Sequence, residues 1–78
     1  MLVRFTKHAL QRIKIRNLSK EEILNTLNQP NSVKKNSHGN LIAQKMKGKH
    51  LLRVFYFIDG NSKVVISAYK TSKVNMHI

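Results

Sequence analysis

Three side chains near the start of the sequence could bind an anion and move a proton. His8, Arg12 and Arg16 recur at intervals of four, so a helix would carry them as one stripe. Histidine titrates near neutral pH and can give or take a proton, while an arginine one turn away can bind the same anion. The spacing fits an exposed basic helix without catalytic function equally well.

Arg53 is a permanent cation inside the apolar run 49–58. A guanidinium in such a run needs an acidic partner or an anionic ligand. The sequence has only three acids, of which Glu21 and Glu22 suit a helix start and Asp59 suits a turn. We therefore favour a ligand such as phosphate, which arginine grips in a bidentate manner and whose developing charge it stabilises.

Ser67 and Tyr69 lie in the next apolar run, where a hydroxyl could position a phosphate and a ring could stack on a base. Without further evidence, ordinary alternation in a strand is the simpler explanation of these two residues. The histidine spacing matches no metal motif, so we predict no metal site and no cofactor. The cations predicted to bind nucleic acid, with one histidine, are Arg12, Arg16, Lys45, Lys47, Lys49, His50, Lys70 and Lys73.

The charge balance is the strongest compositional feature. Fifteen Lys and Arg oppose three acids and give a formal charge of +12. Such a chain attracts polyanions: nucleic acid is the first expectation, an anionic membrane surface the second and a specific acidic protein the third. With no cysteine and no run long enough for a signal peptide or a membrane span, we expect one cytoplasmic domain over residues 1–78.

Two helices are expected before any long strand. Thr6 can cap a helix that runs to about Arg16. Ser19 and Glu22 form a capping box for a second helix, which Pro30 ends. Segment 1–5 is predicted to be flexible or strand-like.

Four strands are predicted to follow, over 32–35, 41–46, 49–58 and 63–70. The expected fold class is therefore α+β, with two N-terminal helices packed on a four-stranded antiparallel sheet in the order ααββββ. Val74, Met76 and Ile78 could add a last short strand.

The loop after Ile58 decides which residues Arg53 faces. Alternation puts Leu52, Val54, Tyr56 and Ile58 on the helix-covered face and Arg53 on the open one. A loop of three or five residues would bring Ser67 and Tyr69 beside Arg53, whereas a two-residue turn would put Ile66 and Ala68 there. We expect the odd loop, because it gives the sheet a clean apolar face. An even register would leave only a basic binding surface.

Three segments together resemble the family called domain of unknown function 4258, within the RelE/ParE-like toxin superfamily. They are Thr6–Ile13 continuing to Ser19, similar to the family's His-Ala-x-x-Arg start; Leu52–Tyr56, similar to its Arg-Val-x-Tyr strand; and Val65–Lys73, similar to its Ile-Thr-x-Tyr ending. Ser67 replaces the usual threonine and keeps the hydroxyl, while the terminal tyrosine of some relatives is absent.

This resemblance implies a compact ααββββ fold shared with metal-independent ribonucleases, and a site built from His8, Arg12, Arg53, Ser67 and Tyr69. We expect a ribonuclease-type toxin with His8, Arg53, Ser67 and Tyr69 as catalytic residues, held in check by an acidic antitoxin. The alternative is a non-catalytic nucleic-acid-binding or regulatory protein that uses the same surface.

Overall fold

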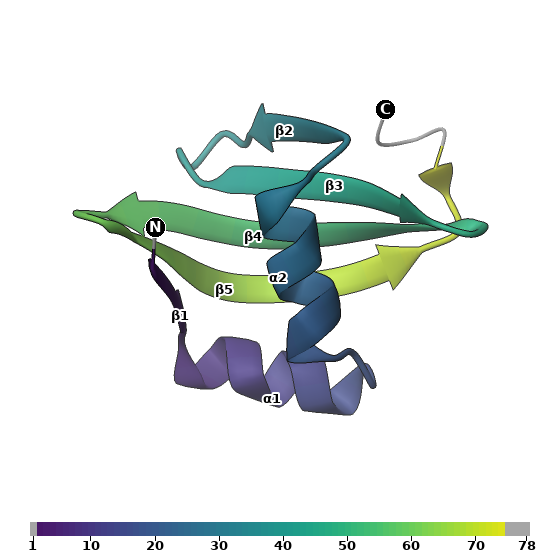
Figure 1. The fold of residues 1–78 in the computed structure, drawn as a ribbon, viewed down its shortest axis with the longest axis horizontal. Helices are drawn as coiled ribbons and strands as arrows, with labels where there is room; N and C mark the ends of the chain where they lie inside the picture. The colour runs from purple at the N-terminus through teal and green to yellow at the C-terminus, as the bar shows by residue number, and fades with distance from the viewer. Residues whose placement is uncertain (1, 75–78) are drawn as a thin grey trace.

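The computed structural model describes residues 2–74 and shows two helices packed on one face of a five-stranded sheet (Figure 1). The helices are α1 (Lys7–Ile15) and α2 (Lys20–Asn28). The strands lie in the order β1-β5-β4-β3-β2. Their bounds are β1 Leu2–Phe5, β2 Ser32–Lys35, β3 Leu41–Lys47, β4 His50–Asp59 and β5 Ser62–Thr71.

The expected four-stranded antiparallel sheet is wrong, because β1 adds a fifth strand that runs parallel to β5. Leu2 pairs with Ser62, and Phe5 with Val65. The segment joins the sheet since β5 has an unpaired edge there, and alternation turns Val3 and Phe5 inward to pack against the core. The other four strands, β2 to β5, are antiparallel and follow the predicted order.

Both helices begin at the predicted caps. The Thr6 hydroxyl accepts a hydrogen bond from the Ala9 backbone N–H at 3.0 Å. Ser19 and Glu22 form the complete capping box at the start of α2. After the end of helix α1, the chain turns at Asn17, which has a φ of 56° in the left-handed region that asparagine tolerates.

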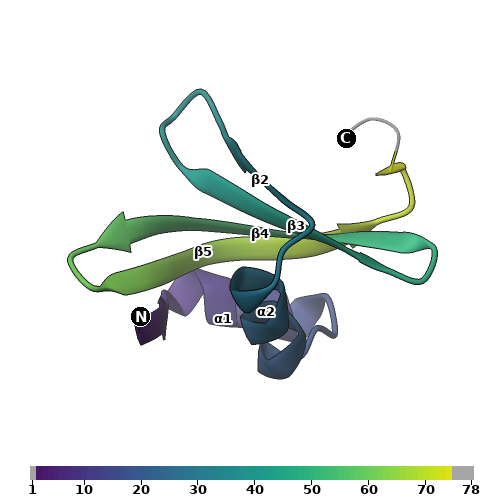
Figure 2. The same ribbon diagram turned by 45° about the horizontal axis from the view of Figure 1, so that its top comes forward.

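The core lies between the helices and the sheet, and Figure 2 shows both helices on the same side of the strands. Ala9, Ile13, Ile23 and Leu27 pack from the helices against alternate residues of β3, β4 and β5. No helix of residues 2–74 lies on the opposite face of the sheet, and there β2 and β3 turn away from the plane of β4 and β5 (Figure 2). We call this side the open face. The sheet residues in the core are Ala43, Leu52, Val54, Tyr56, Val65 and Ala68.

The prediction of an odd loop between β4 and β5 is wrong. Asp59 pairs with Ser62, so the turn has two residues, Gly60 and Asn61. The ladder then shifts at a β-bulge, where Tyr56 pairs with Val65 but Phe55 pairs with Ser67. The extra residue reverses which side chains of β5 face the helices beyond that point.

A tail strand at Val74, Met76 and Ile78 was also expected. Of these three residues only Val74 is described, and it lies outside the strands. Met76 and Ile78 lie outside the described residues.

Candidate phosphate-binding site

Arg53 lies in the middle of the open face, between β3 and β5. It pairs with Gln44 on one side and with Tyr69 on the other. Its Nε donates to Gln44 Oε1 at 2.8 Å, and its Nη1 donates to the Tyr69 hydroxyl. Gln44 in turn donates from Nε2 to Ser32 Oγ at 3.0 Å. A row of polar side chains therefore crosses four strands and holds the guanidinium in place.

The partners that hold Arg53 are neutral. Among residues 2–74, the ion pairs of the acidic side chains are Asp59 with Arg4 and Glu22 with Lys70, each at 2.8 Å. No carboxylate of a described residue lies within salt-bridge distance of Arg53. A half-buried cation without a counter-ion is a suitable binding group for an anionic ligand.

Two aromatic rings flank the Arg53 guanidinium. Phe55 and Tyr69 stack with centroids 5.9 Å apart and an angle of 23° between the rings. The guanidinium carbon lies 5.3 Å from the Phe55 centroid and 5.6 Å from that of Tyr69. These contacts and the two hydrogen bonds fix the orientation of the group. The hydrogen bonds of Arg53 to described residues use Nε and Nη1.

Arg16 supplies a second guanidinium from the end of α1. Strand β1 pairs only with the first part of β5, so Arg16 can reach the edge of its second part. Its Nη1 donates to the Ala68 carbonyl at 2.9 Å and to Ser67 Oγ at 3.4 Å. Its guanidinium carbon lies 5.9 Å from the centroid of the Tyr69 ring. The structure thus joins four of the predicted site residues in one cluster: Arg16, Arg53, Ser67 and Tyr69.

His8 and Arg12 form a separate pair on α1. Arg12 Nε donates to His8 Nε2 at 3.3 Å, and the His8 side chain is exposed. The hydrogen bonds of the described residues do not connect this pair to Arg53.

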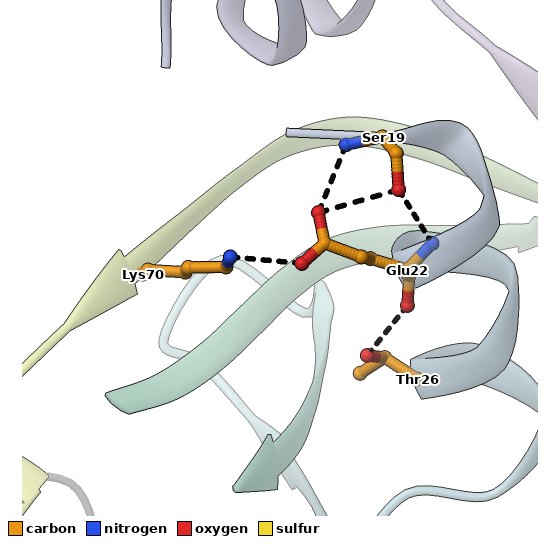
Figure 3. A network of polar contacts seen from close by, with 4 residues as sticks. All are labelled: Ser19, Glu22, Thr26 and Lys70. Carbon is orange, nitrogen blue, oxygen red and sulfur yellow. Dashed lines mark hydrogen bonds and ion pairs between the residues drawn. The ribbon is translucent and has the colours of Figure 1, made fainter. Parts of the chain in front are cut away.

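Lys70 lies on the helix-covered face and binds the N-terminus of α2 (Figure 3). Glu22 Oε1 accepts from Lys70 Nζ, while Oε2 accepts from the Ser19 backbone N–H at 3.0 Å. These contacts, led by the hydrogen bond from Lys70, lower the pKa of Glu22 below its usual value of 4.5. Thr26 donates its hydroxyl to the Glu22 carbonyl at 2.9 Å and continues the network.

The remaining predicted cations do not gather at Arg53. Lys45 pairs with the core residue Leu52, so alternation places it on the helix-covered face, as it does Lys47. Lys49 and His50 lie at the turn between β3 and β4, and Lys73 follows β5. The predicted binding residues therefore divide between the two faces and the ends of the sheet.

Sequence reasoning missed Gln44 and Ser32. Gln44 is fully buried, yet it lies in a strand whose neighbours Ile42 and Ala43 are apolar. Gln44 follows the apolar run 41–43 and precedes Lys45, so it does not stand out in the sequence as Arg53 does. A search for a neutral acceptor across the sheet from Arg53 would have found Gln44.

A hollow of about 400 Å³ opens on the other side of the molecule. Its lining includes Val3, Leu24 and Leu27 together with Glu21 and Lys63. The Lys63 amine donates to the Leu27 carbonyl at 3.2 Å and thus occupies one wall. None of these residues belongs to the predicted site.

Within residues 2–74, no three side chains of the His, Cys, Asp and Glu types come together as metal ligands would. Across the same described residues, no helix combines the length and apolar character needed to cross a membrane.

Comparison with known proteins identifies a family. The model of the family described as domain of unknown function 4258 matches residues 5–70, which include every residue of the Arg53 cluster. This chain therefore belongs to that family. No curated protein and no solved structure matches it significantly.

Proposed function

We propose that this protein is a metal-independent ribonuclease that holds a phosphate of RNA at Arg53. The observation that supports the proposal is the Arg53 guanidinium, half-buried and fixed by Gln44 and Tyr69, with no carboxylate from residues 2–74 against it. A cation held in place before binding stabilises the negative charge that develops on the phosphorane oxygens, and it need not reorganise during the reaction.

In the proposed reaction, the 2′-hydroxyl of RNA attacks the adjacent phosphorus, and the bond from phosphorus to the 5′-oxygen breaks. The products are a 2′,3′-cyclic phosphate and a 5′-hydroxyl. Arg53 stabilises the phosphorane, while Ser67 and Tyr69 position the phosphate and Arg12 and Arg16 bind the neighbouring backbone. His8 takes the proton from the 2′-hydroxyl or supplies one to the leaving oxygen.

The same proposal places the protein with the RelE/ParE-like toxins, acting in the cytoplasm. A ribonuclease would damage its own cell, so it requires an inhibitor. With a formal charge of +12, this chain would bind an acidic protein by charge complementarity. We propose that the partner is an antitoxin that covers the basic surface.

A second candidate function is RNA binding without cleavage, as in a regulatory protein. The position of His8 favours it, because His8 contacts Arg12 while the hydrogen bonds of the described residues do not join the pair to Arg53. Binding at Arg53 would then occur without a proton-transfer group beside the phosphate.

Turnover in the presence of EDTA separates the two candidates. A labelled RNA should be cut to products that end in a cyclic phosphate, and the same oligonucleotide with 2′-deoxy sugars should remain intact. RNA that is retarded in a gel but never cut would contradict the ribonuclease proposal and support binding alone.

A further inference from the structure

We infer that the open face takes RNA as a single strand, with one base stacked on the ring of Phe57. This inference rests on the proposed function and names its substrate class. It concerns a residue of β4 that the reaction described above does not use.

Phe57 lies on the same face of β4 as Arg53 and Phe55, because the three residues alternate with the core residues Val54 and Tyr56. Phe55 is already stacked on Tyr69 and half-buried. The residue Phe57 is 38% exposed. A strand holds this ring at the surface, where it offers a flat apolar platform in line with the Arg53 guanidinium.

The charge on this part of the face suits a nucleic acid. Arg4 pairs with Val64, the cross-strand partner of Phe57, so Arg4 lies in the same row of the sheet. The acid nearby, Asp59, is paired with Arg4 at 2.8 Å. Around Phe57, Arg4 and Asp59 thus neutralise each other, and Arg53 is a cation of the same face that no carboxylate of residues 2–74 compensates.

An exposed ring selects for unpaired bases. In a duplex both faces of each base are covered by its neighbours, so a protein ring cannot stack on an internal base without disrupting the helix. In a single strand the bases can separate and stack on aromatic side chains while cations bind the phosphates. Arg53 lies four residues from Phe57 on the same face of β4. The two side chains therefore fit a single strand of RNA that runs along β4.

The test uses a labelled eight-nucleotide RNA with 2′-O-methyl sugars, which cannot be cleaved, either alone or annealed to its complement. The single strand should bind more tightly than the duplex. Phe57→Leu keeps an apolar side chain but removes the flat ring, and it should weaken binding of the single strand by about 5- to 100-fold. Phe57→Tyr keeps the flat ring and should bind the single strand about as tightly as the parent does.

Ile58→Ala is the matched control. Ile58 is the next residue, is 45% exposed, and pairs with Lys63 on the helix-covered face. Its substitution should leave the affinity unchanged. Equal binding of duplex and single strand, or unchanged binding by Phe57→Leu, would overturn the inference.

Because the oligonucleotide cannot be cut, the result does not depend on cleavage. Selective binding through Phe57 by a protein that leaves natural RNA intact would contradict the ribonuclease proposal and keep this inference. Cleavage of natural RNA by a protein that binds duplex as tightly as single strand would contradict this inference and keep the ribonuclease proposal.

Discussion

Arg53 faces Tyr69 across the β4–β5 ladder although the turn between the strands has an even number of residues. If the pairing at the turn continued without interruption, Ala68 would stand opposite Arg53. The bulge at Ile66 adds one residue to β5 and brings Tyr69 to that position instead. The site therefore depends on an irregularity of one strand as much as on the residues themselves.

Tyr69→Phe should loosen Arg53 while leaving the ring contacts in place. The variant removes the hydroxyl that accepts from Arg53 Nη1 but keeps the stack on Phe55. We expect the free energy of unfolding to fall by about 1–2 kcal/mol, since a hydrogen bond to a charged group is lost at a half-buried position. Urea denaturation measures this change. An unaltered midpoint would show that the hydroxyl does not support the guanidinium.

His8→Gln should separate proton transfer from binding. If His8 transfers a proton, the variant should cut RNA about 10²- to 10⁴-fold more slowly. Its affinity for the uncleavable oligonucleotide should stay close to that of the parent. His38→Gln is the control, because His38 is an exposed histidine in the turn before β3. Full activity of His8→Gln would remove His8 from the mechanism.

Arg16→Ala should weaken RNA binding in a salt-dependent way. Arg16 contributes its charge at the edge of β5, beside Ser67 and Tyr69. Loss of one phosphate contact should lower the slope of log affinity against log salt by about 0.7 for a single strand. Lys14→Ala removes an exposed cation of the same helix and serves as the control. Equal slopes for Arg16→Ala and the parent would place Arg16 outside the RNA path.

Glu22→Gln should reveal a pH-dependent contribution to stability. The folded protein lowers the pKa of Glu22 below its usual value of 4.5. The ionised carboxylate therefore stabilises the fold in full at pH values above 4.5. This contribution disappears as the pH falls through the lowered pKa. At pH 7 the variant should be less stable by about 0.5 kcal/mol, because the ion pair with Lys70 is partly exposed.

Thermal unfolding between pH 2 and pH 7 measures the difference between Glu22→Gln and the parent. The two curves should converge at low pH, since glutamine still supplies the acceptor of the capping box. Glu21→Gln is the control: it removes the other carboxylate of the first turn of α2 but keeps the pair of Glu22 with Lys70, so it should lose less stability at pH 7 than Glu22→Gln. A difference that persists at pH 2 would show that the carboxylate charge is not its cause.

The local parts of the fold were predictable because short-range patterns specify them. Thr6, Ser19 and Glu22 cap the helices as expected, and the alternation of β4 places Leu52, Val54 and Tyr56 in the core. Each of these predictions depends on residues only a few positions apart. The sequence contains the complete signal in such cases.

Non-local pairing was harder to predict. Segment Leu2–Phe5 is short and reads as flexible or strand-like, and only its contact with β5 makes it a parallel strand. The bulge at Ile66 has no marker such as glycine, so the sequence predicts one unbroken alternation along the whole of β5. Before the bulge the residue of β5 that packs in the helix-covered core is Val65, and after the bulge it is Ala68.

The neighbours of Arg53 were partly predicted, but the structural reason given for them was wrong. Tyr69 does lie beside it, but the odd loop invoked to bring it there does not exist. Gln44 was not anticipated, because the pairing of β3 with β4 sets that contact and no local pattern marks it.

The most direct test compares RNA cleavage in EDTA by the parent, Arg53→Lys and Arg4→Lys. Lysine keeps the charge at position 53 but has one amine in place of the planar guanidinium, whose Nε binds Gln44 and whose Nη1 binds Tyr69. Arg4 lies on the same face in an exposed ion pair and controls for charge and surface position. We predict that Arg53→Lys lowers the cleavage rate by about 10²- to 10³-fold, while Arg4→Lys remains near the parent. Equal rates for the parent and Arg53→Lys would contradict the assignment of Arg53 as the centre of the site.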